Sequence, residues 1–112
     1  QDEVAAGIRA VAAPGHTPGH TAFHIESEGK RLLLGADFCN HYVLSLQRPD
    51  WEVRFDADKA AAAATRKKLL DMIATDRIPF TSYHMPFPAV GYVEKTSDGG
   101  YRYVPATYQL TL

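Results

Sequence analysis

A turn built from glycine, proline and histidine separates the first two strand-like runs of this chain. It reads Ala13-Pro14-Gly15-His16-Thr17-Pro18-Gly19-His20-Thr21. Gly15 permits a close backbone approach, and Pro18 stiffens the residues that follow it. A rigidly presented imidazole loses little entropy when it binds a metal ion. The turn therefore favours His16 as a metal ligand over a polar surface residue.

The surrounding pattern predicts an α+β chain in which strands dominate. Apolar runs bounded by turn residues predict strands over 8–12, 21–26, 31–35, 78–84, 90–95 and 101–105. Residues 27–30 and 96–100 have the composition of hairpin turns. Because the run Leu32-Leu33-Leu34 is continuous, we expect that strand to be covered on both faces. Residues 38–51 are expected to be irregular.

One main helix is expected over 58–75. Asp56 or Asp58 can serve as its N-cap, and the alanine run 60–64 supplies helix propensity. The cationic run Arg66-Lys67-Lys68 is expected to face largely away from the apolar side. That side carries four residues at helical spacing: Ala62, Leu69, Leu70 and Ile73.

Composition excludes several classes of partner. The 112 residues suffice for one core, and 46% hydrophobic with 22% charged residues is typical of a soluble globular domain. A net charge of −1 without a basic cluster argues against nucleic acid, and no apolar run approaches the roughly 18 residues of a membrane span. The chain begins at Gln1, so we expect a processed or partial product. Its compartment, cytoplasmic or periplasmic, stays open, because any targeting signal would lie in a part that precedes Gln1.

Two further residues qualify as metal ligands. Asp37 ends the apolar run 32–36, where a bare buried carboxylate would cost several kcal/mol. It is therefore paired, hydrogen-bonded, capping a turn or metal-bound. His84 ends a predicted strand and is followed by Met85-Pro86-Phe87-Pro88, whose prolines restrict the next loop. With His16, these residues predict half of a two-metal site.

The remaining candidates have supporting roles. His20 is expected to orient a ligand by hydrogen bonding, and His24, inside a strand, to be structural. His41 is a weaker candidate for contact with substrate, as are the aromatic residues Phe38 and Phe87. Cys39 has no cysteine partner and is expected to be a buried small hydrophobe.

Three of these segments together resemble the C-terminal half of metallo-β-lactamase-fold hydrolases. They are the turn 15–20, the strand end Gly35-Ala36-Asp37 and Tyr83-His84. More narrowly, the chain is similar to the methyl parathion hydrolase-like branch. That similarity rests on 55–62, Arg66-Lys67-Lys68, His84-Met85-Pro86-Phe87-Pro88 and 100–106, and the whole resemblance runs from Ile8 to Tyr108.

The resemblance implies an αβ/βα sandwich in which residues 1–112 form the C-terminal half of the domain. It implies two metals, usually zinc, with His16 serving one, His84 the other and Asp37 bridging both as a catalytic residue. A metal-bound hydroxide would then attack an ester, lactone or organophosphate, all of them small molecules. A glyoxalase II-like thioesterase, which would use the same kind of two-metal site, is an alternative.

The chain departs from this family in lacking its His-x-His-x-Asp-His motif. Catalytic zinc normally takes three protein ligands and a water, so we expect the isolated chain to bind metal weakly or not at all and to be inactive. Without the other half, an apolar sheet face would be exposed. The expected partner is the missing N-terminal half or a second copy. A non-catalytic half-domain that only self-associates stays open.

Overall fold

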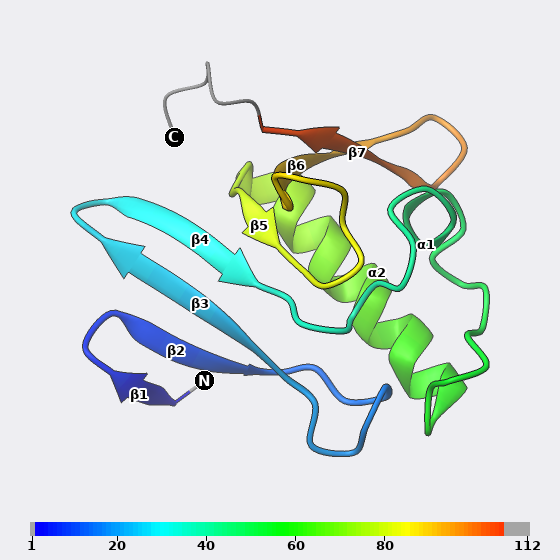
Figure 1. Ribbon diagram of the computed structural model, residues 1–112, viewed down its shortest axis with the longest axis horizontal. Coiled ribbons are helices and arrows are strands. Elements are labelled where there is room, and N and C mark those ends of the chain that lie inside the picture. Colours follow the sequence, from blue (N-terminus) through cyan, green and yellow to red (C-terminus); the bar gives the residue numbers. More distant parts are fainter. Residues whose placement is uncertain (1, 107–112) are drawn as a thin grey trace.

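The computed structural model describes residues 2–106, which form one sheet with a long helix across one face (Figure 1). The strands follow the chain order across the sheet: β1 (Glu3–Ala5), β2 (Ile8–Ala12), β3 (Thr21–Ser27), β4 (Lys30–Leu34), β5 (Phe80–Thr81), β6 (Val90–Lys95) and β7 (Tyr101–Pro105). All neighbours are antiparallel except β4 and β5, which are parallel. Their connection contains α1 (Leu44–Gln47) and α2 (Lys59–Asp76). The predicted α+β class, with a mostly antiparallel sheet and one main helix, is confirmed.

Local turn chemistry explains the hairpins. Glu28 and Gly29 adopt φ of 51° and 77° between β3 and β4, and such a turn matches the twist of paired strands. Between β6 and β7, Asp98 accepts hydrogen bonds from the Thr96 hydroxyl and the Gly100 amide. The strands predicted on both sides of these turns agree with the observed ones to within a residue. Strand β1 and the short helix α1 were not predicted, and α1 corrects the expectation that 38–51 is irregular.

The prediction of one strand over 78–84 is wrong, because pairing stops after Thr81. The Ser82 hydroxyl and the Tyr83 amide both donate to the Ala36 carbonyl, at 2.5 and 2.9 Å. His84 then takes a left-handed φ of 69°, which a strand does not permit. His84 therefore lies in a turn rather than at a strand end.

Helix α2 begins and ends with its own caps. The Asp58 side chain accepts from the Ala61 amide at 3.0 Å, and Arg77 closes the helix in the left-handed conformation. This decides between the two predicted N-caps in favour of Asp58. The predicted apolar stripe is buried as expected: Ala62, Leu69, Leu70 and Ile73. Arg66, expected to face away from that stripe, is instead only 1% exposed.

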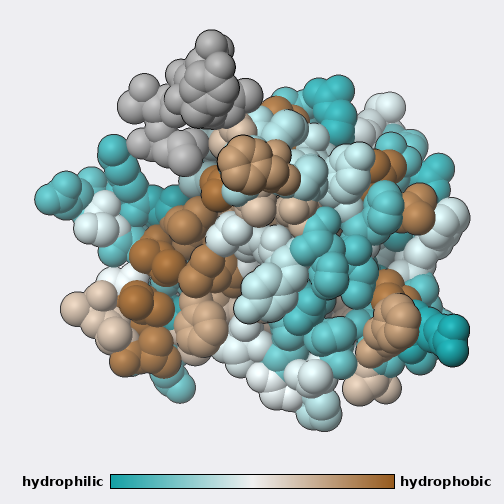
Figure 2. All heavy atoms as spheres, viewed as in Figure 1, coloured by the Kyte–Doolittle hydropathy of each residue, from teal (hydrophilic) through white to brown (hydrophobic). Residues whose placement is uncertain are grey.

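The sheet has one covered and one open face. Val11, Ala22 and Leu33 belong to the core cluster that also contains residues of α2. Because side chains alternate along a strand, Phe23 and Leu34, which pair across β3 and β4, point the other way and are only half-buried. Figure 2 shows apolar side chains gathered over these strands. The expectation that the 32–34 strand is covered on both faces is thus wrong for the described residues.

No helix within residues 2–106 is both long and apolar enough to cross a membrane. Tyr108, where the family resemblance was expected to end, lies outside the described residues.

Candidate metal centre

Three loops meet at one edge of the sheet and carry the predicted ligands. Strands β2 and β4 are both antiparallel to β3, and β4 is parallel to β5, so all three run in the same direction. Their carboxyl ends therefore lie at the same edge. His16 follows β2, Asp37 follows β4 and His84 follows β5, which brings residues from three distant segments together.

The two histidines approach different oxygens of one carboxylate. His16 Nε2 lies 3.7 Å from Asp37 Oδ2, and His84 Nε2 lies 3.2 Å from Asp37 Oδ1. The side chains of His16 and Asp37 are 25% and 26% exposed, and that of His84 is 50% exposed. The cluster is therefore accessible from one side. The role of these residues as ligands stays a prediction.

His20 holds the backbone of Asp37. The Asp37 amide donates to His20 Nε2 at 3.0 Å, so Nε2 is unprotonated and the ring proton is on Nδ1. Nδ1 donates to the Ala13 carbonyl at 2.7 Å. The rings of His16 and His20 meet edge to face, with centroids 5.9 Å apart. His20 thus connects the backbone of Ala13 to that of Asp37, and its role in orienting a ligand stays a prediction.

The backbone around Asp37 is held in uncommon conformations. Ala36 has φ of 53° and His84 has φ of 69°, and left-handed residues other than glycine cost roughly 1–3 kcal/mol each. The Ala36 carbonyl accepts from both Ser82 and Tyr83, and the Gly35 amide donates to Thr81. The two loops thus hold each other in the geometry that places His84 beside Asp37.

Asp56 is part of the site, although the sequence suggested only a helix cap. Its side chain is 1% exposed, and Oδ1 lies 2.9 Å from His16 Nδ1. Its other oxygen, Oδ2, has no hydrogen-bond partner among the described residues and lies 3.9 Å from Nη1 of the buried Arg66. Asp56 stands two residues before the N-cap Asp58, and the sequence indicated it only as the alternative cap and as part of the segment 55–62.

The other candidates occupy different surroundings. His41 Nδ1 accepts from the Val43 and Leu44 amides at 3.1 and 3.2 Å, where α1 begins. Phe38 is 3% exposed and packs edge to face on Phe80 in the core. Phe87 is 97% exposed three residues after His84. Contact of any of these residues with substrate stays a prediction.

Cys39 is fully buried and free, as predicted. Burial raises the pKa of its thiol far above the usual range, because the thiolate would be desolvated. A thiol held in this form is a poor nucleophile. Cys39 therefore belongs to the core and not to the chemistry of the site.

The donor atoms suit a metal, but their number is too small. Two ligands of one tetrahedral zinc ion, each about 2.0–2.1 Å from it, stand about 3.3 Å apart, close to both His–Asp distances. Within residues 2–106, however, no group of three or more His, Cys, Asp or Glu side chains is arranged to hold a metal by itself. The residues present fit part of a metal site.

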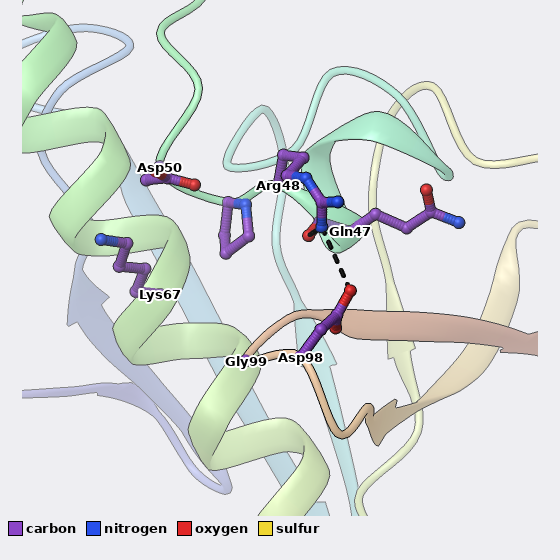
Figure 3. Close-up of a pocket in the computed structure, with 7 residues that line it drawn as sticks. Gln47, Arg48, Asp50, Lys67, Asp98 and Gly99 are labelled. Carbon is purple, nitrogen blue, oxygen red and sulfur yellow. Dashed lines mark hydrogen bonds and ion pairs between the residues drawn. The ribbon is translucent and has the colours of Figure 1, made fainter.

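A separate hollow lies between α1, α2 and the turn from β6 to β7 (Figure 3). Arg48 Nη1 bonds Asp98 Oδ2 there at 3.3 Å, and both side chains are about half exposed. The hollow is also lined by Lys67 and Asp50, so its two cations are balanced by two carboxylates. It contains none of the residues His16, Asp37 and His84.

No protein-family model and no curated protein matches the chain. Several solved structures, in contrast, match the chain. A hydrolase described as AbOPH of the beta-lactamase superfamily superposes with a TM-score of 0.90 and 23% identity, over 96% of this chain and 37% of its own. AidC, described as a dizinc quorum-quenching lactonase, gives 0.90 and 29% over 97% and 37%. A probable metal-dependent hydrolase from Staphylococcus aureus gives 0.68 and 21% over 98% and 39%.

These structural neighbours are described as a hydrolase of the beta-lactamase superfamily, a dizinc lactonase and a probable metal-dependent hydrolase. The chain spans somewhat more than a third of the length of each. The described strands and the single long helix account for the match, since almost the whole chain superposes. The chain thus has part of the metallo-β-lactamase α+β fold.

Proposed function

We propose that this chain supplies one side of the two-metal site of a hydrolase. The observation that carries the proposal is the position of Asp37, whose two oxygens face different imidazole nitrogens, those of His16 and His84. In this assignment His16 would hold one ion, His84 would hold the other, and Asp37 would be shared by both. The dizinc description of AidC supports zinc as the metal.

The remaining ligands must come from outside the described residues. His16, Asp37 and His84 give each ion one imidazole and a shared carboxylate, whereas catalytic zinc takes three protein ligands. The chain corresponds to only 37% of AbOPH and of AidC. We propose that residues 1–112 are the C-terminal half of the domain and that the N-terminal half of the parent protein completes each site.

The half-buried apolar face of β3 and β4 supports this arrangement. Phe23 and Leu34 line a hollow on that face together with Ala36, Thr81, Ser82 and Tyr83. An apolar surface of this kind gains stability when another layer covers it. The missing half of the parent would cover it, and in its absence a second copy of the chain would.

When bound, two such ions lower the pKa of water and neutralise charge on a carbonyl or phosphoryl oxygen. The chain's own contribution is to place their ligands. His20 orients the Asp37 backbone, and the hydrogen bonds to Ala36 set the position of His84. The buried thiol of Cys39 takes no part, which agrees with a reaction that needs no side-chain nucleophile.

The substrate class we propose is a lactone or another ester, including an organophosphate ester. The 29% identity to a lactonase supports the lactone. The resemblance of 55–62 to the methyl parathion hydrolase-like branch supports the organophosphate. A thioester, as in glyoxalase II-like enzymes, is the alternative, and in all three reactions negative charge develops on an oxygen that bound metal ions would stabilise.

The test uses the full-length protein that contains this chain. Metal content is measured by elemental mass spectrometry after dialysis without chelator, and hydrolysis is assayed on an N-acyl homoserine lactone, an aryl phosphotriester and a thioester. We expect close to two metal ions per chain and turnover that stops when the metals are chelated. Absence of bound metal, or turnover that survives its complete removal, would contradict the proposal.

A non-catalytic role is the second candidate, because the open face of β3 and β4 by itself favours self-association. Sedimentation of the 112-residue chain tests self-association, and the metal content of the parent protein separates the two candidates. A metal-free dimer with no activity, from a parent that also lacks metal, would favour this role. A monomer would contradict it.

A further inference from the structure

Asp56 has His16 as its main partner. Asp56 Oδ1 lies 2.9 Å from His16 Nδ1, whereas Asp56 Oδ2 is 3.9 Å from Arg66 Nη1. The shorter bonds of Arg66 go elsewhere, from Nε to the Pro49 carbonyl at 2.9 Å and from Nη2 to the Trp51 carbonyl at 2.8 Å. Asp56 is thus not simply the counter-ion of a buried arginine. Its strongest contact is with a predicted metal ligand 40 residues away.

Backbone hydrogen bonds also hold the segments that carry His16 and Asp56 next to each other. The Ala57 amide donates to the His16 carbonyl at 3.1 Å, and the Asp58 amide donates to the Gly15 carbonyl at 2.9 Å. Gly15 is pressed against α2, where an added Cβ would lie 2.2 Å from the Ala62 nitrogen. Two backbone bonds and one side-chain bond therefore join the His16 turn to the start of α2, which leaves the imidazole little freedom to rotate.

The Asp56 contact decides where the ring proton of His16 resides. A carboxylate only accepts hydrogen bonds, so His16 Nδ1 must donate and carry the proton. In the neutral ring, Nε2 is then unprotonated, and its lone pair faces Asp37 Oδ2 at 3.7 Å. Two acceptors that face each other at this distance suit a cation between them. Carboxylate–histidine pairs of this kind orient metal ligands in general.

We propose that Asp56 is a positioning residue that holds His16 as the Nδ1–H tautomer and so presents Nε2 to a metal ion, and that Arg66 holds Asp56 in place. The metal-binding part of this inference rests on the proposed function. The tautomer part does not, because it concerns the metal-free protein. Arg66 also fixes the loop after α1, which carries the exposed Trp51, so the same contacts link that loop to the site.

The first measurement is the tautomer of His16 in the metal-free, full-length wild-type protein. Side-chain ¹⁵N–¹H correlation NMR at alkaline pH distinguishes Nδ1–H from Nε2–H rings, and a His16→Gln variant assigns the signal. We expect the Nδ1–H form. An Nε2–H ring would overturn the inference. This measurement needs no altered Asp56, so it decides even if an Asp56 variant fails to fold.

The second measurement compares two matched substitutions, Asp56→Asn and Asp58→Asn, by zinc titration of the full-length protein. Both make the same chemical change. The Asp58 side chain is exposed and accepts from the Ala61 amide at the start of α2, and asparagine caps a helix equally well without changing the backbone bond of Asp58 to Gly15. We expect Asp56→Asn to weaken zinc binding about 10- to 100-fold and to mix the His16 tautomers. Asp58→Asn should leave both unchanged.

Equal zinc affinity of wild type and Asp56→Asn would overturn the metal-presenting role of Asp56. A wild-type protein that binds no zinc would remove the proposed function and that role together. In that case, the tautomer spectrum still decides whether Asp56 holds the ring of His16. The two failures are therefore distinguishable.

Discussion

His16 and His84 reach the same aspartate from two loops that are built very differently. The His16 turn rests against α2 through Gly15, and its imidazole bonds the buried Asp56 on the side away from Asp37. The His84 loop follows a two-residue strand, and its side chain is 50% exposed. Among the described residues, the only polar contact of the His84 ring is with Asp37.

This difference shows that, within residues 2–106, the imidazole of His16 has a second partner in the buried Asp56, whereas that of His84 does not. The ring of His16 is held through Nδ1 by its hydrogen bond to Asp56, so binding a metal at Nε2 would cost little ordering entropy. The ring of His84 is set by its unusual backbone and by Asp37 alone. Its final orientation would depend on a bound ion or on residues outside the described part of the chain.

The largest effect is expected from Asp37→Ala, which removes the point where both loops meet. If Asp37 is the shared metal ligand we propose, its removal from a full-length protein that contains this chain should cost several kcal/mol of transition-state stabilisation, or about a thousandfold in kcat/KM. Metal content should fall as well. The control is Asp71→Ala. Asp71 lies on the exposed side of α2, where its carboxylate pairs with Lys95 of β6. Normal activity and metal content in Asp37→Ala would remove Asp37 from the site.

Gly15→Ala should disturb the His16 loop without touching a ligand. The new Cβ would lie 2.2 Å from the Ala62 nitrogen, and Gly15 has φ of 135°. We expect a loss of at least about 2 kcal/mol in the free energy of unfolding, measured by urea denaturation. The matched control is Gly19→Ala in the same turn, where nothing lies within 4 Å of the new Cβ. Equal stability of the two variants would show that the turn does not depend on its contact with α2.

His16→Ala and His84→Ala compare the two loops directly in metal-free protein. Removing His16 leaves the buried Asp56 without its hydrogen-bond partner, which costs about 1–3 kcal/mol of unfolding free energy. Removing the half-exposed His84 should cost about 0.5 kcal/mol or less. Urea denaturation with chelator present measures both. A larger loss of unfolding free energy in His84→Ala than in His16→Ala would show that the His84 loop, and not the His16 loop, contributes more to stability.

The smallest effect concerns His24, a histidine in β3 outside both loops. Burial, and then the charge of Arg31, lowers the pKa of His24, so its neutral form is favoured in the folded state. Stability from this group is therefore present above the unfolded pKa of about 6.5 and is lost as the pH falls through the lowered folded pKa. His24→Gln, which keeps an acceptor for Arg31, should flatten the stability profile between pH 7 and pH 5. An unchanged profile would show that His24 does not contribute.

Much of the fold was predictable because it depends on residues close together in the sequence. The hairpin at Glu28 and Gly29, the helix start at Asp58 and the turn at Gly15 follow from local conformational preference. The errors arose where a distant contact overrode the local pattern. The strand predicted over 78–84 stops early because Ser82 and Tyr83 bond the Ala36 carbonyl.

The candidate site shows the same division. His16, Asp37 and His84 were identified from residue types beside turns and apolar runs, and the structure brings them together. Asp56 was assigned only a capping role, because its bond to a histidine 40 residues away has no local signal. Arg66 was expected on the solvent side because charge alone argues for exposure, whereas its guanidinium bonds the buried carbonyl of Pro49.

Residue patterns along the chain were enough to predict the hairpin turns, the long helix, most of the strands and the candidate ligands His16, Asp37 and His84. The shared direction of β2, β4 and β5, which gathers these three residues at one edge, is a property of the folded sheet. The tertiary structure also brings Asp56 to His16. The physical reason is range: turn and helix preferences act over a few residues, whereas strand direction and buried polar pairing depend on how distant segments pack.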